Sequence, residues 1–391
     1  MSSYTVAQNT SFLTVASVLQ KVISFFYFIF VARIIQVENT GVYFFAISFT
    51  TIFTVVADFG MGPVLTREAA RFPDESESYF TPVFWTKIMF GLGAYLLIVL
   101  FANILKYREL TKTLIYVSGI TMFFDSLAGA FNSIFRAKKN LVYESMGIIG
   151  SQFITLLIGT FALLNHWPLV WLILAYAIPS FLNLIYISGF LKKVYGIGVR
   201  FAWNAQIFKI FIAIALPFAL AGIIGRFYSY SDSLLMSKLL SAKELGWWSV
   251  PYKIAFAFQF IPVALSASVY PVFSSLFLTN KMAIGPLFEK SWRYLFAIIF
   301  PVAFGLIAIA DPVVRRVFGQ EFSPSITPLR FLLVSLIFGF LSFIPGALLN
   351  ATNKQKTQTA LMALVLLVNV ILNIILLPRL GITGAAISAL V

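Results

Sequence analysis

Long apolar runs with few charges recur along this whole chain, and they limit what it can fold into. A helix rises 1.5 Å per residue, so about 20 apolar residues cross the roughly 30 Å hydrocarbon core of a bilayer. Eleven runs reach that length: 11–35, 41–65, 80–104, 113–135, 142–164, 169–191, 208–237, 246–278, 291–310, 328–350 and 358–378. A twelfth run, 381–391, makes only about 16 Å of helix. The pattern predicts an all-α integral membrane protein with about twelve transmembrane helices, the last of them incomplete in this chain.

The composition excludes most covalent chemistry. Of the 391 residues, 60% are hydrophobic and 11% are charged, and the chain has no cysteine and one histidine, His166. Thiol nucleophiles, disulfides and thiolate metal sites are therefore excluded, and histidine metal clusters and catalytic triads are nearly excluded. The connectors between the apolar runs hold at most about 17 residues, too few to fold as an enzyme domain. We therefore predict no enzyme activity, no catalytic residue, no metal site and no cofactor.

The net charge of +14 fits a membrane better than a nucleic acid. No run of Lys and Arg exceeds two residues, and most of these residues lie in the short connectors. With the N-terminus inside, 14 of the 28 Lys and Arg residues lie in inner connectors and 10 in outer ones. Cytoplasmic connectors of membrane proteins carry the larger share of Lys and Arg. The bias predicts a multi-pass protein of the inner, cytoplasmic membrane with a cytoplasmic N-terminus and no nucleic-acid partner.

Two segments of the sequence echo segments further along, which indicates an internal repeat. Sliding the chain by 205 residues places 32–43 on 237–248; in both, a cation near a helix end is followed by a turn, a glycine and an aromatic residue. An offset of 214 sets 136–139 against 350–353, each in the connector after the fourth span of a half. The repeat predicts two six-helix bundles, an N-terminal lobe over 1–200 and a C-terminal lobe over 201–391 with span twelve truncated.

Three motifs follow one another along the chain. Arg33 precedes two hydrophobic residues, a five-residue turn, Gly41 and an aromatic residue; 58–68 reads DFGMGPVLTRE; and 381–386 reads GITGAA. Together they resemble the polysaccharide-export branch, the O-antigen and oligosaccharide flippases, of the multidrug/oligosaccharidyl-lipid/polysaccharide transporter superfamily. The resemblance implies two bundles around a cavity lined by spans 1, 2, 7 and 8. It also implies a cargo of isoprenoid-pyrophosphate-linked oligosaccharide for cell-surface polysaccharide, with membrane lipids and a glycan polymerase or glycosyltransferases as further partners.

Four cations lie inside predicted spans, where a charge at mid-bilayer costs about 2.5–3.5 kcal/mol on insertion scales, and three of them are candidates for one site. They are Lys21 in span 1, Arg226 in span 7 and Lys253 in span 8. Lys21 and Arg226 are related by the 205-residue offset. In the fold that the resemblance implies, all three point at one cavity, which predicts a site for pyrophosphate or another anion. The alternative is that these cations pair with acidic residues in the spans.

Two tyrosines near Arg226, Tyr228 and Tyr230, are further candidates for binding the cargo. Sugars stack on aromatic rings and bond to hydroxyl groups, so these side chains could face a glycan. Ordinary packing of the helix against a neighbour explains the same pattern.

Asp58, Asp125 and Asp232 are the Asp residues within the spans and are candidates for coupling transport to a proton or Na⁺. For Asp58 a structural role at the Gly60 break is favoured, and Asp125 has an equal alternative as a partner of Lys87. Lys87 itself is expected to reach the inner interface by extending its side chain.

Two rival functions remain at the level of the sequence. A cation-coupled multidrug exporter of the same superfamily needs a cavity dominated by carboxylates, which the three cations disfavour. A membrane glycosyltransferase usually needs a large outer loop with acidic catalytic residues, and no connector in this chain is long enough to be one. The favoured interpretation is a flippase that works by alternating access.

Overall fold

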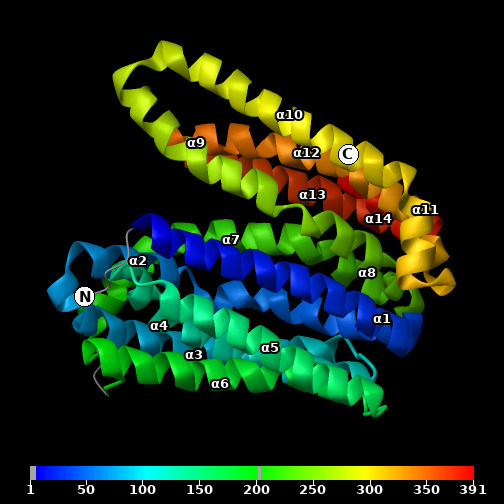
Figure 1. Cartoon of the computed structure of the whole chain (residues 1–391), viewed down its shortest axis with the longest axis horizontal. Coiled ribbons are helices and arrows are strands. Elements are labelled where there is room, and N and C mark those ends of the chain that lie inside the picture. The colour runs from blue at the N-terminus through cyan, green and yellow to red at the C-terminus, as the bar shows by residue number, and fades with distance from the viewer. Residues whose placement is uncertain (1–5, 201–203) are drawn as a thin grey trace. The chain divides into compact units, whose positions relative to one another are not determined.

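The computed structural model describes residues 6–200 and 204–391. Every regular element in this part of the chain is helical (Figure 1). The long helices are α1 (Val6–Asp58), α2 (Met61–Arg71), α3 (Ser76–Ile104), α4 (Glu109–Ala137), α5 (Val142–Leu164), α6 (Val170–Tyr195), α7 (Ala205–Leu239), α8 (Ala242–Ala257), α9 (Phe260–Thr279), α10 (Ile284–Ala308), α12 (Ile326–Ala351), α13 (Gln355–Leu380) and α14 (Ile382–Leu390). The short ones are η1 (Pro73–Glu75), η2 (Lys281–Ala283), α11 (Ala310–Pro312), the π-helix η3 (Val313–Phe318) and η4 (Gln320–Ser325).

The predicted membrane spans are confirmed as helices. Among the described residues, ten segments are long and apolar enough to cross a membrane, and one of them, Ser11–Arg71, contains the two predicted spans 11–35 and 41–65. Helices suit these sequences because a helix satisfies its backbone hydrogen bonds internally, where lipid offers no partner. The chain is therefore an all-α, multi-pass membrane protein.

Two predicted spans are interrupted. Span 2 breaks between α1 and α2, where Phe59 and Gly60 have φ of 45° and 71°. Span 8 breaks between α8 and α9, shortly before Pro262. Because Pro262 has no N–H to give to the carbonyl of Phe258, that carbonyl instead accepts the N–H of Ile261 at 3.1 Å. α1 is itself two helices that meet at Gln36, whose φ is 67° and ψ 172°.

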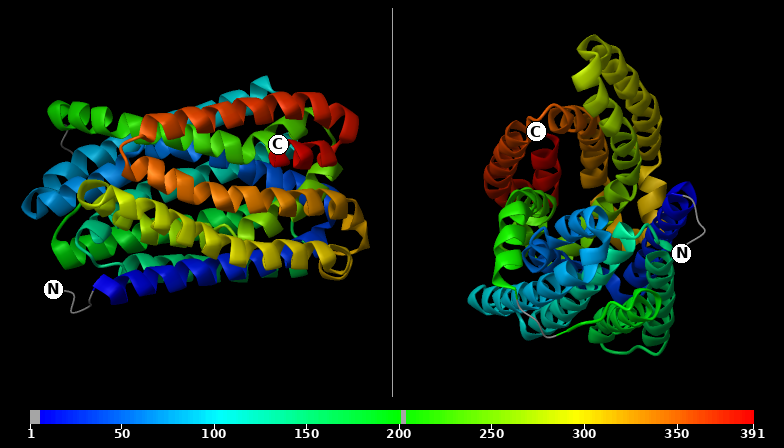
Figure 2. Two further views of the ribbon diagram at one scale, coloured as in Figure 1. Left: turned by 90° about the horizontal axis from the view of Figure 1, so that it is seen from above. Right: turned by 90° about the vertical axis from the view of Figure 1, so that its left-hand side faces the viewer.

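The chain forms two compact units. The N-terminal unit comprises the described residues up to Phe28 and Phe45–Arg226, and the C-terminal unit comprises Ile29–Phe44 and Phe227–Val391. Both α1 and α7 therefore contribute to each unit. These compact units have other boundaries than the predicted lobes 1–200 and 201–391. The two lobes stay a prediction. Within each unit the long helices run side by side (Figure 2).

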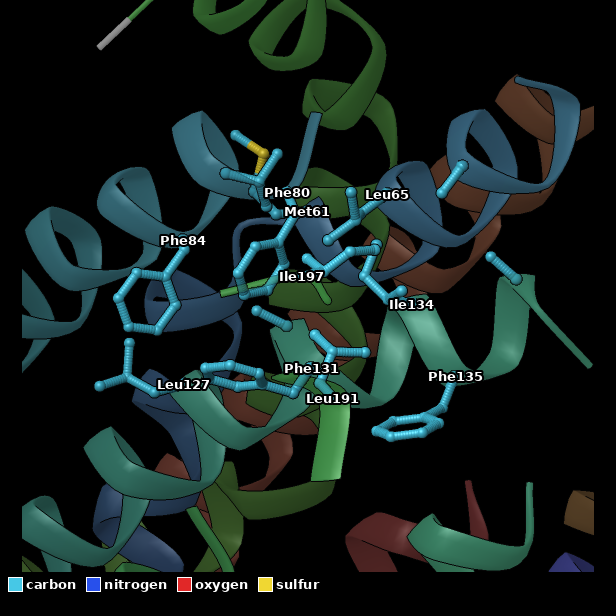
Figure 3. Close-up of a cluster of buried hydrophobic side chains, with 14 of the residues drawn as sticks. Met61, Leu65, Phe80, Phe84, Leu127, Phe131, Ile134, Phe135, Leu191 and Ile197 are labelled. Carbon is cyan, nitrogen blue, oxygen red and sulfur yellow. The ribbon is translucent and has the colours of Figure 1, made fainter. Parts of the chain in front are cut away.

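Each unit has its own apolar core. In the N-terminal unit, α2, α3, α4 and α6 bury a cluster that includes Met61, Phe80, Phe131 and Leu191 (Figure 3). In the C-terminal unit, α12 packs against α8, α9, α10 and α14 and buries Phe340, which is 1% exposed. Within lipid, such side chains stabilise the bundle by close packing between helices and not by removal from water.

Helix ends recur at both predicted offsets, and the internal repeat itself stays a prediction. Ends of α4 and α12 have the same capping pattern: Lys139 and Asn353, related by 214 residues, have φ of 55° and 61°. Asn140 N–H bonds to the carbonyl of Phe135, and Lys354 N–H bonds to that of Leu349 at the equivalent place. At the offset of 205, Gln36 and Ser241 both lie where one helix gives way to the next, but their φ values of 67° and −80° differ.

Candidate functional site

Two of the residues predicted to bind an anion have exposed side chains. Lys21 on α1 and Arg226 on α7 are both exposed. Among the described residues, 6–200 and 204–391, neither has an ion-pair or hydrogen-bond partner. Lys253 on α8 is half-buried. Lys21 and Arg226 belong to the N-terminal unit and Lys253 to the C-terminal unit. The alternative pairing with Asp58, Asp125 or Asp232 is not observed for Lys21 or Arg226, and the grouping of all three cations in one site stays a prediction.

Lys21 lies in a polar stripe that the sequence reasoning missed. Thr14, Ser17, Lys21 and Ser24 follow one another at spacings of three and four residues, so they share one face of α1. All four are exposed or half-buried, and the Ser24 hydroxyl donates to Gln152 Oε1 on α5 at 3.0 Å. Lipid penalises such a row of polar groups, which indicates that this face meets water or a polar ligand. The helical spacing alone was a sufficient signal.

The two candidate tyrosines differ in their surroundings. The ring centroid of Tyr230 lies 5.8 Å from that of Tyr252, which stacks on Phe256 at 4.1 Å. Packing against α8 therefore accounts for Tyr230. Tyr228 is 40% exposed, so its ring is open to a ligand.

Asp58 and Lys87 form an ion pair in the N-terminal unit. Lys87 Nζ lies 2.5 Å from Asp58 Oδ1 and donates to the carbonyl of Ser126 at 3.0 Å. The Lys87 side chain is 1% exposed and that of Asp58 35% exposed. The prediction that Lys87 reaches the inner interface is wrong, because the buried ammonium has a carboxylate partner. That partner is Asp58 and not Asp125, which instead accepts a hydrogen bond from Ser180 on α6.

The unequal burial of this pair predicts unequal mutant stabilities. Asp58→Asn leaves the buried Lys87 charge unpaired, which costs about 3–5 kcal/mol. Lys87→Met leaves a carboxylate that still reaches solvent, so we expect a smaller loss. Thermal unfolding of the purified variants checks this: Asp58→Asn should melt lowest, and the Asp58→Asn/Lys87→Met double variant should melt above it. Equal melting temperatures for the single variants would contradict the pairing.

Asp232 belongs to a buried polar cluster in the C-terminal unit. Asn373 Nδ2 on α13 donates to Asp232 Oδ1 at 2.7 Å and to Asn369 Oδ1 at 3.1 Å. Asp232 is 8% exposed and Asn373 is 0% exposed. Asn373 Oδ1 and Ser233 Oγ are buried without a hydrogen-bond partner among the described residues. A carboxylate with neutral oxygens beside it suits a proton or a hard cation.

The sequence reasoning missed Asn369 and Asn373, although a signal was present. The two residues lie one helical turn apart in α13, whose span is otherwise strongly apolar. Two amides on one face of such a helix need a polar partner, and Asp232 supplies it. Across the part of the chain that the structure describes, no three His, Asp or Glu side chains form a group able to hold a metal ion.

Known proteins resemble the chain over nearly its whole length. Residues 6–277 match the family described as "Polysaccharide biosynthesis protein". The "Probable low-salt glycan biosynthesis flippase Agl15" of Haloferax volcanii is 22% identical over 390 residues, covering 98% of this chain and 80% of the relative. The lipid II flippase MurJ in an inward closed conformation has a TM-score of 0.77 at 18% identity, covering 96% and 84%. An inward-facing multidrug resistance MATE transporter of the MOP superfamily has a TM-score of 0.79 at 15% identity, covering 95% and 90%. At these identities, the similarity to the two solved structures shows a shared fold.

Proposed function

Because the chain belongs to the polysaccharide biosynthesis protein family, we propose that it is a flippase for isoprenoid-pyrophosphate-linked oligosaccharide. It moves this lipid-linked glycan across the membrane by alternating access and supplies the assembly of cell-surface polysaccharide. The observation that carries the proposal is the pair Lys21 and Arg226, two unpaired cations at repeat-related positions within spans. A pyrophosphate supplies the opposite charge that such cations lack.

The proposed cycle divides the cargo between two environments. Lys21, Arg226 and Lys253 hold the pyrophosphate, and the exposed Tyr228 stacks on a sugar, while the isoprenoid chain stays in the bilayer. Each charge-assisted bond to a phosphate contributes about 1.5–3 kcal/mol. The two repeat halves then alternate their access to the two sides of the membrane.

Transport of a defined cargo tests the proposal. The purified protein is placed in vesicles with a fluorescent isoprenoid-pyrophosphate oligosaccharide, and a membrane-impermeant glycosidase is added outside. We expect the inner-leaflet pool to become cleavable faster than in protein-free vesicles. An equal rate with and without protein would refute the flippase proposal.

A multidrug exporter is the alternative on the same fold. Such a carrier needs carboxylates that a drug-sized cation can reach, but Asp58 is paired with Lys87 and Asp232 is buried. The cations Lys21 and Arg226 are the open charges instead. The relative from Haloferax volcanii is named as a glycan biosynthesis flippase, which also supports the glycan cargo.

We place the coupling to an ion gradient at the in-span Asp residues. Asp232 is the strongest of the three because its buried carboxylate is bonded to the amide of Asn373, which is bonded in turn to Asn369. Asp125, with Ser180 as its partner, is the second candidate. Asp58 is the weakest, since Lys87 already neutralises it.

The topology proposed for the chain is a cytoplasmic N-terminus in the inner, cytoplasmic membrane. Reporters fused after Lys139 and Lys193 are expected to be cytoplasmic, and reporters in the Lys106–Lys112 and His166 connectors to be outside. The reason is the excess of basic residues in the first set of connectors. The activities of phosphatase and fluorescent-protein fusions check this, and the reverse pattern would overturn the orientation. Glycan polymerases or glycosyltransferases that use the delivered glycan are the proposed functional partners.

A further inference from the structure

Two glycines in the C-terminal unit allow two helix starts to approach very closely. A Cβ added to Gly41 on α1 would overlap the carbonyl oxygen of Ala242 and lie 2.7 Å from the nitrogen of Gly246 on α8. A Cβ added to Gly246 would overlap the carbonyl oxygen of Val37 and lie 2.9 Å from its carbonyl carbon. Neither position therefore has room for a side chain.

The contact is reciprocal under the internal repeat. Gly41 and Gly246 are related by the offset of 205 residues, and so are Val37 and Ala242. Each glycine thus meets the carbonyl that lies four residues before the other glycine. Two repeat halves that meet at equivalent positions form a local two-fold contact, in which small residues let the backbones come together.

Further contacts join the same two helix starts. Phe44, one turn after Gly41, packs its ring 5.3 Å from that of Tyr252 on α8. Ser249, one turn after Gly246, is 0% exposed. Arg33, before the turn at Gln36, donates from Nε to the carbonyl of Val317 at 2.7 Å and from its second nitrogen to that of Arg316. These carbonyls are at the end of the π-helix η3, so Arg33 ties the first span to the connector before α12.

We propose that this contact, the glycine seal (Arg33, Val37, Gly41 and Phe44 against Ala242, Gly246, Tyr252, Arg316 and Val317), closes one side of the carrier and separates once in each transport cycle. The proposal rests on the proposed function, since a flippase must expose its site to both sides in turn. In the topology proposed above, the seal closes the outer side. At the two glycines the contact is between backbones, which suits repeated opening because no side chains interlock at its centre.

The test uses thiol labelling, for which the natural absence of cysteine provides a blank background. Ser249→Cys places a nearly isosteric reporter behind the seal, and Ser133→Cys places one in the N-terminal unit, where Ser133 is also 0% exposed. The purified protein is held in lipid nanodiscs, where a charged maleimide reaches both faces. Gly41→Leu cannot fit the closed contact, so we expect it to raise the labelling rate at position 249 about tenfold or more while position 133 stays protected.

Two variants control the experiment. Gly339→Leu adds the same side chain to α12 at a glycine with nothing within 4 Å of the added Cβ, so its labelling at position 249 should match the parent. Arg33→Gln removes the two bonds to η3 without adding bulk and should raise labelling severalfold.

The outcomes of this experiment test the seal independently of the flippase proposal. Unchanged labelling at position 249 in both Gly41→Leu and Arg33→Gln would overturn the seal. Labelling at position 133 as well in Gly41→Leu would make the glycine pair a folding contact and also overturn it. No glycan takes part in the labelling assay. Failure of the flippase proposal in the vesicle assay would therefore leave the labelling result valid, and failure of the seal would leave the vesicle result valid.

Discussion

Glutamate in place of Lys21 or Arg226 is expected to abolish glycan export. A carboxylate at either position repels pyrophosphate, whereas the natural cation provides a charge-assisted bond. Alanine removes that bond without adding repulsion and should weaken export about ten- to a hundredfold. Lys21→Arg should retain much of the activity because the charge matters more than the shape. Lys253 is expected to be less sensitive than the two repeat-related cations. The vesicle assay described above gives the rates at matched protein levels.

A matched control separates a binding role from a general effect of charge. Lys209 is an exposed lysine in the first turns of α7, on the same helix as Arg226. Lys209→Ala should export glycan at the parent rate. If the alanine variants at Lys21, Arg226 and Lys253 all inserted stably and exported glycan normally, the anion site would be wrong and the multidrug exporter would become the better proposal.

Asp232→Asn is expected to remove the dependence of export on an ion gradient. Its carboxylate is the charged group in a buried cluster with Asn369 and Asn373, so a neutral amide there takes away the affinity for a proton or Na⁺. The coupling between two such sites is typically about 5- to 150-fold, and the ion-stimulated rate should fall within that range. Export with and without an imposed Na⁺ or proton gradient measures the loss.

Asp125→Asn and Asp58→Asn complete this series, and Asp74→Asn is its control because Asp74 is exposed in the short helix η1. We expect smaller effects on coupling for both in-span residues and none for Asp74. Normal ion-dependent export in all three in-span variants would eliminate carboxylate coupling. The membrane potential or downstream consumption of the glycan would then be the driving force.

Several residues of the candidate site could be predicted from the local sequence pattern. Lys21 and Arg226 were found because a cation within an apolar run is costly wherever the run crosses the bilayer. The row that contains Lys21 and the pair Asn369 and Asn373 follow the helical period and were also available to sequence reasoning. Neutral polar residues cost less in a span than charges do, so they give a weaker signal of a functional site.

The partners of the charges did not follow from pattern. Lys87 was expected at the interface, yet it is buried against Asp58, 29 positions earlier in the chain. Tyr230 and Tyr228 have the same chemistry two residues apart, but one packs on Tyr252 and the other is open. Which of two such residues is buried depends on the neighbouring helix, and a single helix contains no information about its neighbour.

The sequence by itself determined the membrane class and the positions of the spans, and it predicts an internal repeat. These are local properties: hydrophobic runs set where helices cross, and repeated turns such as Lys139 and Asn353 keep the same backbone conformation. The tertiary structure alone decided that Lys87 pairs with Asp58, that Asn373 holds Asp232, and that Gly41 meets the start of α8. The physical reason is that burial, ion pairing and close backbone contact arise only between helices that pack together, and many packings share one hydrophobic pattern.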